Sequence, residues 1–331
     1  MLPLKGIRVL DLSRILAGPH AAQSLFDLGA EVIKVEAPWG DDSRTWGPPF
    51  QSGFDGAEVA SYFLSCNRGK EIVFANLKEE RSKVLELMNS VDIVIENFRP
   101  GTFERLLGPV RSDLIVCSIS GYGQTGPRRD EPAFDLTMQA RTGIMSVTGE
   151  DGGPPAKVGV AWIDVMTGMN AVSSILACLL RRERSGIGAR IDISLWDTAI
   201  SSLVNQAHNA LMGVEGKRMG SSHPNLVPYR AFRAIDGWFA IGVGTGGQWE
   251  KLNEALSLGA PASWNENSVR IENRDRVEGM VQSSVGRLTR SELEKLLVGV
   301  PCAPVNTILE ALGDPQSISR GNVVDYSGVS T

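Results

Sequence analysis

The sequence predicts an α/β protein with a Rossmann-like parallel sheet in a large domain and a smaller α+β domain. Apolar strands and amphipathic helices alternate in the first half of the chain, and a β-hairpin pattern follows in the second half. The composition is that of an ordinary globular protein, because 42% of the 331 residues are hydrophobic and 21% are charged. A chain of this length can bury a full core and can divide into two domains.

The first half begins with a β-α-β pattern. Residues 7–12 (IRVLDL) and 31–36 (EVIKVE) are typical of buried strands, and a helix between them opens near Pro19 and ends at Gly29. Such a unit requires a right-handed crossover between parallel strands. The same pattern predicts a helix over about 78–90, strands over 91–98 and 114–120, and a strand or strand-to-helix turn over 190–197.

A long helix is predicted over 164–182. Its apolar residues recur at steps of three and four: Val165, Met169, Val172, Leu176 and Leu179. Arginines fill its last turn and Gly186 ends it. Because polar residues interrupt its most apolar part, we expect a buried helix and not a membrane span.

The second half of the sequence no longer alternates between strands and helices. Two strand-like runs flank Asp236-Gly237, which indicates a β-hairpin, and helices are predicted over 248–256 and around 290–298. Between these helices, 263–276 is a polar stretch with only a weak strand, SVRI, in it. The predicted domains are therefore 1–224 and 225–310.

The stretch from Gly242 to Gly247 matches G-x-G-x-x-G, the glycine pattern of dinucleotide sites. A dinucleotide site requires a parallel βαβ unit, whereas the strand before this stretch is part of the predicted hairpin. The alternatives are a flexible loop or a loop that closes over a substrate, since glycine lets backbone approach a ligand.

Asp164 lies at the predicted start of the long helix, and two interpretations remain open. Aspartate is a preferred N-cap residue, and the spacing alone favours this structural role. A helix N-terminus also stabilises a carboxylate, and one ionised near the usual pKa of about 3.9 can attack an activated acyl group.

Composition and the remaining polar residues exclude several classes of function. A net charge of −5 without a basic stripe argues against nucleic-acid binding, and three scattered histidines argue against a metal site. Four cysteines without CxxC spacing, and an N-terminus that runs directly into a strand, predict a cytoplasmic protein. Asp41 and Asp42 have no obvious partner and are expected to be exposed.

Several motifs in this order resemble class III CoA-transferases, the formyl-CoA-transferase, carnitine-CoA-transferase and bile-acid-inducible family. The resemblance covers about residues 5–325. Its motifs are GIRVLDLSRILAGPHAAQSLFDLGAEVIKVE, DDSRTWGPPF, NRGK, VIENFRPG, SISGYGQTGP and VGVAWIDVMTG. The stretch SSHPNLVPYRAF most resembles the branch that acts on dicarboxylic acids such as succinate and hydroxymethylglutarate.

The resemblance implies a function for individual residues. Asp164 corresponds to the family's nucleophile, which forms an acyl-aspartyl anhydride with loss of CoA thiolate. Gly244, Gly246, Gly247 and Gln248 correspond loosely to a loop that shields the intermediate. The family's CoA contacts correspond to Leu16, Ala17, Lys70, Asn97, Phe98, Arg105 and Tyr122.

The resemblance also implies CoA or acyl-CoA as a substrate, a small carboxylic acid as the second substrate, no permanently bound cofactor and no metal. It implies an interlocked homodimer without membrane or nucleic-acid partners, and a segment 311–331 that returns toward the large domain. The family's fold also hosts α-methylacyl-CoA racemases, which use a histidine where Phe134 stands here. Since phenylalanine cannot transfer a proton, this favours a transferase over a racemase; a non-catalytic CoA-binding paralogue is a further alternative.

Overall fold

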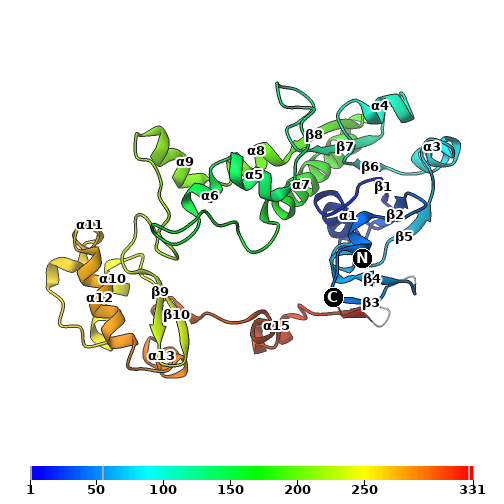
Figure 1. Ribbon diagram of the computed structural model, residues 1–331. Coiled ribbons are helices and arrows are strands. Elements are labelled where there is room, and N and C mark those ends of the chain that lie inside the picture. The colour runs from blue at the N-terminus through cyan, green and yellow to red at the C-terminus, as the bar shows by residue number, and fades with distance from the viewer. Residues whose placement is uncertain (1, 54–55, 327–328, 331) are drawn as a thin grey trace. The chain divides into compact units, whose positions relative to one another are not determined.

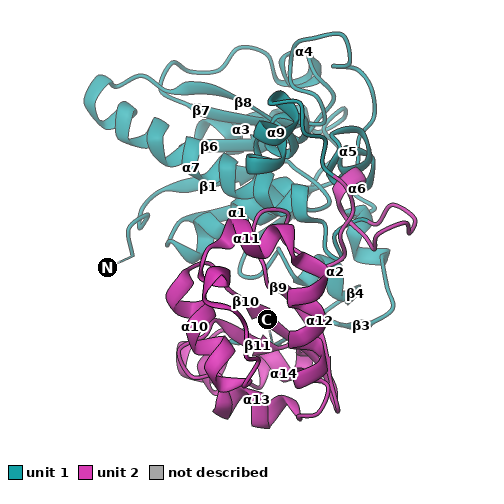
Figure 2. Ribbon diagram, turned by 90° about the vertical axis from the view of Figure 1, so that its left-hand side faces the viewer, with its two compact units in different colours: residues 1–145, 157–216, 323–331 teal, residues 146–156, 217–322 magenta. Residues whose placement is uncertain are grey.

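The computed structural model describes residues 2–53, 56–326 and 329–330. The chain divides into two compact units, coloured separately in Figure 2: unit 1 comprises 1–145, 157–216 and 323–331, and unit 2 comprises 146–156 and 217–322. Two segments that precede the predicted boundary at residue 225, 146–156 and 217–224, thus belong to unit 2.

A six-stranded parallel sheet forms the centre of unit 1 (Figure 1), which confirms the predicted α/β fold. Its strands lie in the order β5-β2-β1-β6-β7-β8. Numbered along the chain this order is 3-2-1-4-5-6, so the direction of succession reverses between β1 and β6. The strands are β1 (Arg8–Asp11), β2 (Glu31–Glu36), β5 (Glu71–Phe74), β6 (Ile93–Glu96), β7 (Ile115–Ser120) and β8 (Ala189–Ser194).

The sequence pattern predicted five of these strands and missed the edge strand β5. β5 has four residues, of which none is fully buried, so it lacks the apolar run of its neighbours. Helices and short strands cover the rest of unit 1: α1 (Ala17–Asp27), η1 (Asp42–Thr45), β3 (Phe50–Ser52), β4 (Glu58–Ala60), α2 (Ser61–Leu64), α3 (Arg81–Asn89), α4 (Thr102–Leu107), α5 (Asp135–Arg141), α7 (Trp162–Ser185), α8 (Leu195–Ser201) and α9 (Val204–Leu211).

The long helix α7 packs on α1, α8 and strands β7 and β8. By length and composition alone it could also cross a membrane. Its buried face differs from the predicted one: Met169 is 48% exposed, whereas small residues lie inside. A Cβ atom on Gly168 would come within 2.8 Å of the Ala17 carbonyl oxygen, so this glycine allows α1 and α7 to approach closely. The buried residues are Ile163, Thr167, Gly168, Ala171, Val172, Ile175 and Leu179.

Unit 2 contains the predicted β-hairpin. Strands β9 (Tyr229–Ala234) and β10 (Gly237–Gly242) pair antiparallel, and β11 (Cys302–Pro304) adds a third strand on the other side of β10. Helices and their apolar side chains form the core against this sheet. The helices of 10, 6, 12 and 7 residues are α10 (Gly246–Ala255), α11 (Asn267–Glu272), α12 (Arg274–Val285) and α13 (Arg290–Leu296).

The weak strand predicted at SVRI is wrong, because these residues lie in α11. Arg270 of this stretch is fully buried, and its guanidinium donates to the backbone carbonyls of Val227, Trp264 and Asn265. Short elements complete the chain: α6 (Ile144–Val147), η2 (Ala262–Asn265), α14 (Ile308–Leu312), α15 (Pro315–Arg320), β12 (Asp325–Tyr326) and β13 (Val329–Ser330).

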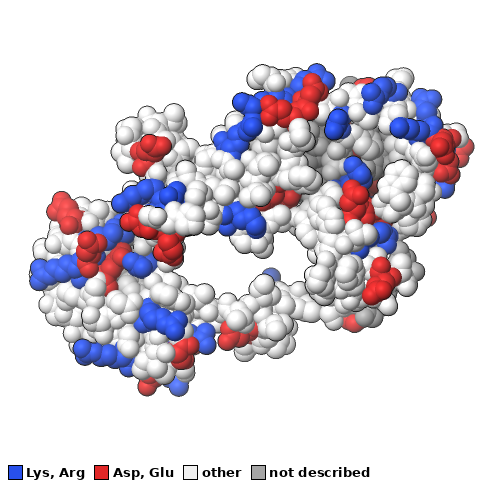
Figure 3. All heavy atoms as spheres, viewed as in Figure 1, with Lys and Arg blue, Asp and Glu red and all other residues white. Residues whose placement is uncertain are grey.

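On the molecular face drawn in Figure 3, cationic and anionic side chains are interspersed. This mixed surface accords with the small net charge of −5. The absence of a nucleic-acid partner stays a prediction.

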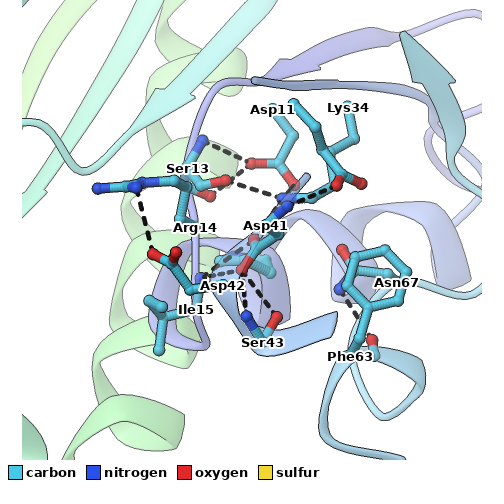
Figure 4. A network of polar contacts seen from close by, with 12 residues as sticks. Asp11, Ser13, Arg14, Ile15, Lys34, Asp41, Asp42, Ser43, Phe63 and Asn67 are labelled. Atoms are coloured by element: carbon cyan, nitrogen blue, oxygen red, sulfur yellow. Dashed lines mark hydrogen bonds and ion pairs between the residues drawn. The ribbon is translucent and has the colours of Figure 1, made fainter. Parts of the chain in front are cut away.

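A fully buried network of two carboxylates and two ammonium groups lies at the end of β1. Figure 4 shows three of its members, Asp11, Lys34 and Asp41. Lys70 Nζ contacts Asp11 Oδ2 at 2.9 Å, and Lys34 Nζ contacts Asp41 Oδ2 at 3.2 Å. Lys34 also donates to the backbone carbonyl of Ser13 at 2.8 Å. The charges balance, which is the condition under which buried ions are tolerated. The prediction that Asp41 is exposed is therefore wrong, whereas Asp42 is exposed and pairs with Arg14.

The network holds its carboxylates ionised. Burial alone would raise the pKa of Asp11, but Lys34, Lys70 and a hydrogen bond from Ser13 outweigh burial and keep that pKa below its ordinary value. The pKa of Asp41 is lowered in the same way against its burial, chiefly by Lys34. Because these pKa values are lowered by folding, their contribution to stability is present above the unfolded-state pKa and is lost as pH falls through the folded-state pKa.

Neighbouring aspartates offer a direct test of this network. Asp41→Asn removes one charge from a buried ion pair and should lower the free energy of unfolding by about 3–5 kcal/mol, as measured by urea titration at pH 7. Asp42→Asn removes an exposed pair and should cost about 0–1 kcal/mol. Equal effects of the two substitutions would contradict the assigned role of Asp41.

Candidate functional site

The sheet offers a ligand site where its strand order reverses, at the carboxyl ends of β1 and β6. The loop after β1 runs through Arg14, and Asn97 follows β6. Asn97 Oδ1 accepts from the Arg14 backbone N–H at 3.0 Å, and Asn97 Nδ2 donates to the Arg14 carbonyl at 2.8 Å. One side chain thus satisfies both backbone groups of Arg14 and fixes the loop beside the sheet.

The next residue of this loop has a strained backbone. Ile15 has a φ of 74°, a region that β-branched residues rarely occupy. Such a conformation costs on the order of 1–3 kcal/mol and persists only where its surroundings hold it. Both carboxylate oxygens of Asp41 accept from the Ile15 N–H, at 3.2 and 3.3 Å. The buried network therefore holds Ile15 in place, and α1 begins two residues later.

Asp164 is the third residue of α7, so the prediction that it caps this helix is wrong. Ala161 occupies the N-cap position and has no side-chain oxygen to offer. Asp135, from the start of α5, accepts from the Ile163 N–H at 2.8 Å in its place. Asp135 thus accepts from a backbone N–H of the first turn of α7, a group that a capping residue would otherwise bind. The Asp164 carboxylate accepts no hydrogen bond from the described residues, so it is available for chemistry.

Asp164 lies where two cavities of unit 1 meet. The large cavity, about 600 Å³, has mostly apolar walls, and the small cavity, about 120 Å³, lies at the strand ends. Ile15, Leu16, Phe134 and Asp164 line both cavities. Additional walls of the large cavity are His20, Trp46, Tyr62, Ser65, Asp135, Leu136, Lys157, Gly159, Val160, Ala161 and Val165. The small cavity is also lined by Arg14, Ala17, Asn97, Ile119, Ser120, Gly121, Ala133 and Leu195.

The electrostatic setting of Asp164 is opposite to that of the buried network. Burial, and then the nearby negative charge of Asp135, raise the pKa of Asp164 to about 7. The expectation of an ordinary pKa near 3.9 is therefore wrong, because desolvation outweighs the effect of the helix N-terminus. Burial, and then the negative charge of Asp164, raise the pKa of Tyr62 to about 12, so this phenol stays protonated at the cavity wall.

Comparison with known proteins decides what kind of site this is. The model of CoA-transferase family III matches residues 4–330. The chain is 41% identical to the succinate–glutarate CoA-transferase of Agrobacterium fabrum, over 98% of this chain and 85% of that protein. It is 37% identical to the succinyl-CoA:glutarate CoA-transferase of Mus musculus, over 99% and 77%. The crystal structure of a CAIB/BAIF family protein from Brucella suis superposes with a TM-score of 0.89, at 41% identity over 99% of this chain and 90% of that one.

The chain belongs to CoA-transferase family III.

The family assignment confirms the resemblance and the prediction of an enzyme that transfers CoA, with CoA thioesters as substrates. Among the predicted CoA contacts, Leu16, Ala17 and Asn97 line the small cavity beside Asp164. In unit 1, the structure therefore brings these three together with the predicted nucleophile.

Four other predicted CoA contacts do not line either cavity. Arg105 is exposed on α4, and Phe98 follows β6 with its backbone N–H bound to Glu96 at 2.7 Å. Tyr122 packs its ring against Trp196 at a centroid distance of 5.8 Å. Lys70 is not available to a CoA phosphate in this arrangement, because its side chain is fully buried.

All three donors of the Lys70 ammonium group are occupied. Nζ donates at 2.9 Å each to Asp11 Oδ2, the Pro19 carbonyl and Asn67 Oδ1. The sequence motif alone could not distinguish this structural lysine from a ligand-binding one.

The predicted substrate loop of Gly244, Gly246, Gly247 and Gln248 belongs to unit 2. Gln248 Oε1 accepts from the Gly244 and Thr245 N–H groups at 2.8 and 3.1 Å, and Thr245 caps α10. These contacts form a capping box at the start of the helix. Because β10 is antiparallel to both neighbours, the loop does not belong to a Rossmann βαβ unit; its shielding function stays a prediction.

Ile15, Asp135 and Tyr62 are among the residues of this site that were not predicted from sequence. No local pattern marks Ile15 or Tyr62. Asp135 follows Phe134 at the start of α5, but its partner Ile163 is 28 residues away, so only the fold reveals the contact. Among the described residues, no group of three or more histidines, cysteines or acidic residues is arranged to hold a metal ion.

The raised pKa of Asp164 predicts how activity depends on pH. Since the carboxylate and not the carboxylic acid can attack, the rate of CoA transfer to an acceptor acid should rise with pH through about 7 in the wild type. Asp135→Asn keeps an acceptor for Ile163 but removes the negative charge, so the rise should move to lower pH. The initial rate of CoA transfer from succinyl-CoA to an acceptor acid, measured between pH 5 and 8.5, reports this shift.

The matched control is Asp130→Asn, which changes an aspartate whose side chain is 80% exposed. It should leave the midpoint of the pH profile in place. An unchanged midpoint in Asp135→Asn would show that Asp135 does not govern the ionisation of Asp164.

Proposed function

We propose that this CoA-transferase moves CoA between dicarboxylic acids through covalent intermediates on Asp164. The observation that carries the proposal is the position of Asp164 at the junction of the two cavities, with a carboxylate that accepts no hydrogen bond from the residues that the structure describes. The relatives named above act on succinate and glutarate by name, which supports dicarboxylic acids as substrates here.

In the proposed reaction, the large cavity holds the acyl group and the small cavity lies on the CoA side. An Asp164 oxygen attacks the thioester carbonyl of the donor, and the C–S bond breaks. The products are CoA thiolate and a mixed anhydride between Asp164 and the donor acid. The thiolate then attacks the aspartyl carbonyl, which gives an aspartyl-CoA thioester and releases the donor acid as its carboxylate.

The acceptor acid completes the exchange. Its carboxylate attacks the aspartyl-CoA thioester, forms a second anhydride and displaces the thiolate again. The thiolate attacks the acceptor's acyl carbon, which yields the new acyl-CoA and restores Asp164. Each attack passes through an oxyanion that backbone N–H groups can stabilise. Atoms and charge balance without water, a metal or a redox partner.

The surroundings of Asp164 suit this chemistry. A carboxylate with a pKa of about 7 is a better nucleophile than one with a pKa near 3.8, and its reactive ionised form is populated at neutral pH. The apolar walls of the large cavity limit water, which would otherwise hydrolyse the anhydride.

We further propose that unit 1 is the CoA-binding domain and that the enzyme works as the interlocked homodimer that the family resemblance implies. The cysteines of the chain, Cys66, Cys117, Cys178 and Cys302, are all free thiols, which supports the proposed cytoplasmic location.

Trapping of the intermediate tests the proposal. Wild-type enzyme incubated with succinyl-CoA and hydroxylamine should lose activity and carry a hydroxamate on Asp164, as detected by peptide mass spectrometry. Asp164→Asn should lower kcat for transfer to glutarate by at least about a thousandfold, because no nucleophile remains. It should carry no adduct and still bind CoA.

Other outcomes identify the alternatives. Exchange of the α-proton of a 2-methylacyl-CoA with deuterated water, without an acceptor acid, would indicate a racemase. Binding of CoA without adduct or transfer with any of several acyl-CoAs would indicate a non-catalytic paralogue. Either result would overturn the proposed covalent mechanism.

A further inference from the structure

The large cavity contains one permanent cation among the described residues that line it, Lys157. Its other ionisable lining groups are Asp135, Asp164, Tyr62 and His20. Burial, followed by the positive charge of Lys70, lowers the pKa of His20, so its imidazole is neutral at pH 7. An anionic ligand in this cavity therefore meets two aspartates and a single source of positive charge.

Backbone contacts hold the Lys157 ammonium group at the cavity wall. Nζ donates to the Val158 carbonyl at 2.9 Å and to the Gly159 carbonyl at 3.3 Å. An ammonium group has three donors, so one remains for a ligand. The long side chain thus bends back along the segment that leads into α7 and that lines the same cavity.

Two residues, Gln139 and Asp135, connect this lysine segment to Ile163, the residue before Asp164. The Val158 N–H donates to Gln139 Oε1 at 2.9 Å, and Gln139 Nε2 donates to Asp135 Oδ1 at 2.5 Å. The second oxygen of Asp135 accepts from Ile163, next to Asp164. Gln139 and Asp135 are both buried. These bonds tie the start of α7 and the backbone next to Lys157 to the same carboxylate, so both segments are held in place along the wall of the large cavity, which Lys157 and Asp164 both line.

We propose that Lys157 binds the remote carboxylate of the dicarboxylic acyl group while the reacting carboxyl group lies at Asp164. This inference rests on the proposed function and adds the residue that distinguishes dicarboxylic from monocarboxylic acids.

The physical reason is the cost of placing a free carboxylate in this cavity. Its walls are mostly apolar and its two aspartates repel an anion, so an unpaired remote carboxylate would be disfavoured. A charge-assisted hydrogen bond from the ammonium group compensates for the lost hydration. A monocarboxylic acyl group presents only a methyl end, which the apolar walls accept without Lys157.

His20 does not meet this requirement. Its Nδ1 is buried without a hydrogen-bond partner among the described residues and faces α7, since a Cβ atom built on Gly168 would lie 2.9 Å from it. A neutral imidazole also provides no net charge for a carboxylate.

Two thioesters of the same chain length test the inference. Succinyl-CoA carries a remote carboxylate where butyryl-CoA carries a methyl group. In ping-pong kinetics, kcat/KM for the donor is independent of acceptor binding, so it isolates recognition of the donor acyl group. Lys157→Met should lower kcat/KM for succinyl-CoA by about 10- to 100-fold and leave that for butyryl-CoA within about twofold. Lys157→Arg should retain most of the preference, because the charge is kept.

The control variant is Lys78→Met, which removes an exposed lysine that lines neither cavity. It should leave both thioesters unaffected. Equal losses for succinyl-CoA and butyryl-CoA in Lys157→Met, or no loss with either, would overturn the proposal for Lys157 while the wild type still transfers CoA. A wild type that releases CoA from neither thioester would instead overturn the proposed function, and the inference with it.

Discussion

The buried ion network at the end of β1 is the constraint on which the geometry of the site depends. Asp11, Lys34, Asp41 and Lys70 come from four separate segments of the chain, and their side chains have no exposure to solvent. Two negative and two positive charges at this depth are stable only as a complete set, since any unpaired member would carry its full desolvation cost. The network therefore holds β1, β2 and the segment around Asp41 in one arrangement.

That arrangement determines the loop between β1 and α1. Asp41 accepts from the N–H of Ile15, Lys34 donates to the carbonyl of Ser13, and Asn97 engages the backbone between them. The loop can then keep a left-handed Ile15 that would be unstable by itself. Ile15 and Leu16 are walls of both cavities, so the strained loop gives the space around Asp164 its shape. The hydrogen bonds from the Ile15 N–H to Asp41 offset the backbone strain at Ile15.

The parts of this structure that local patterns encode could be predicted from the sequence. The alternation of strands and helices yields the parallel sheet, and Asp236-Gly237 indicates the hairpin, because each depends on neighbours in the chain. Asp41 and Asp135 could not be assigned in this way. The sequence around Asp41 predicts an exposed acid, because its partner Lys34 lies on another segment of the chain. Asp135 accepts a hydrogen bond from Ile163, which is 28 residues away in the sequence. Lys70 illustrates the opposite error, since a cation in a suggestive motif is fully engaged by internal acceptors.

The same reasoning explains why aspartates of one domain have such different chemistry. Asp11 and Asp41 are buried beside ammonium groups, which lower their pKa values and make them fixed structural anions. Asp164 is half-buried near the carboxylate of Asp135 and accepts no hydrogen bond from the described residues, and its pKa rises to about 7. Loss of hydration acts to raise the pKa of all three, so it cannot be what separates a structural from a reactive carboxylate. The sign of the nearest charge makes the distinction, and that sign is set by the long-range contacts of the fold.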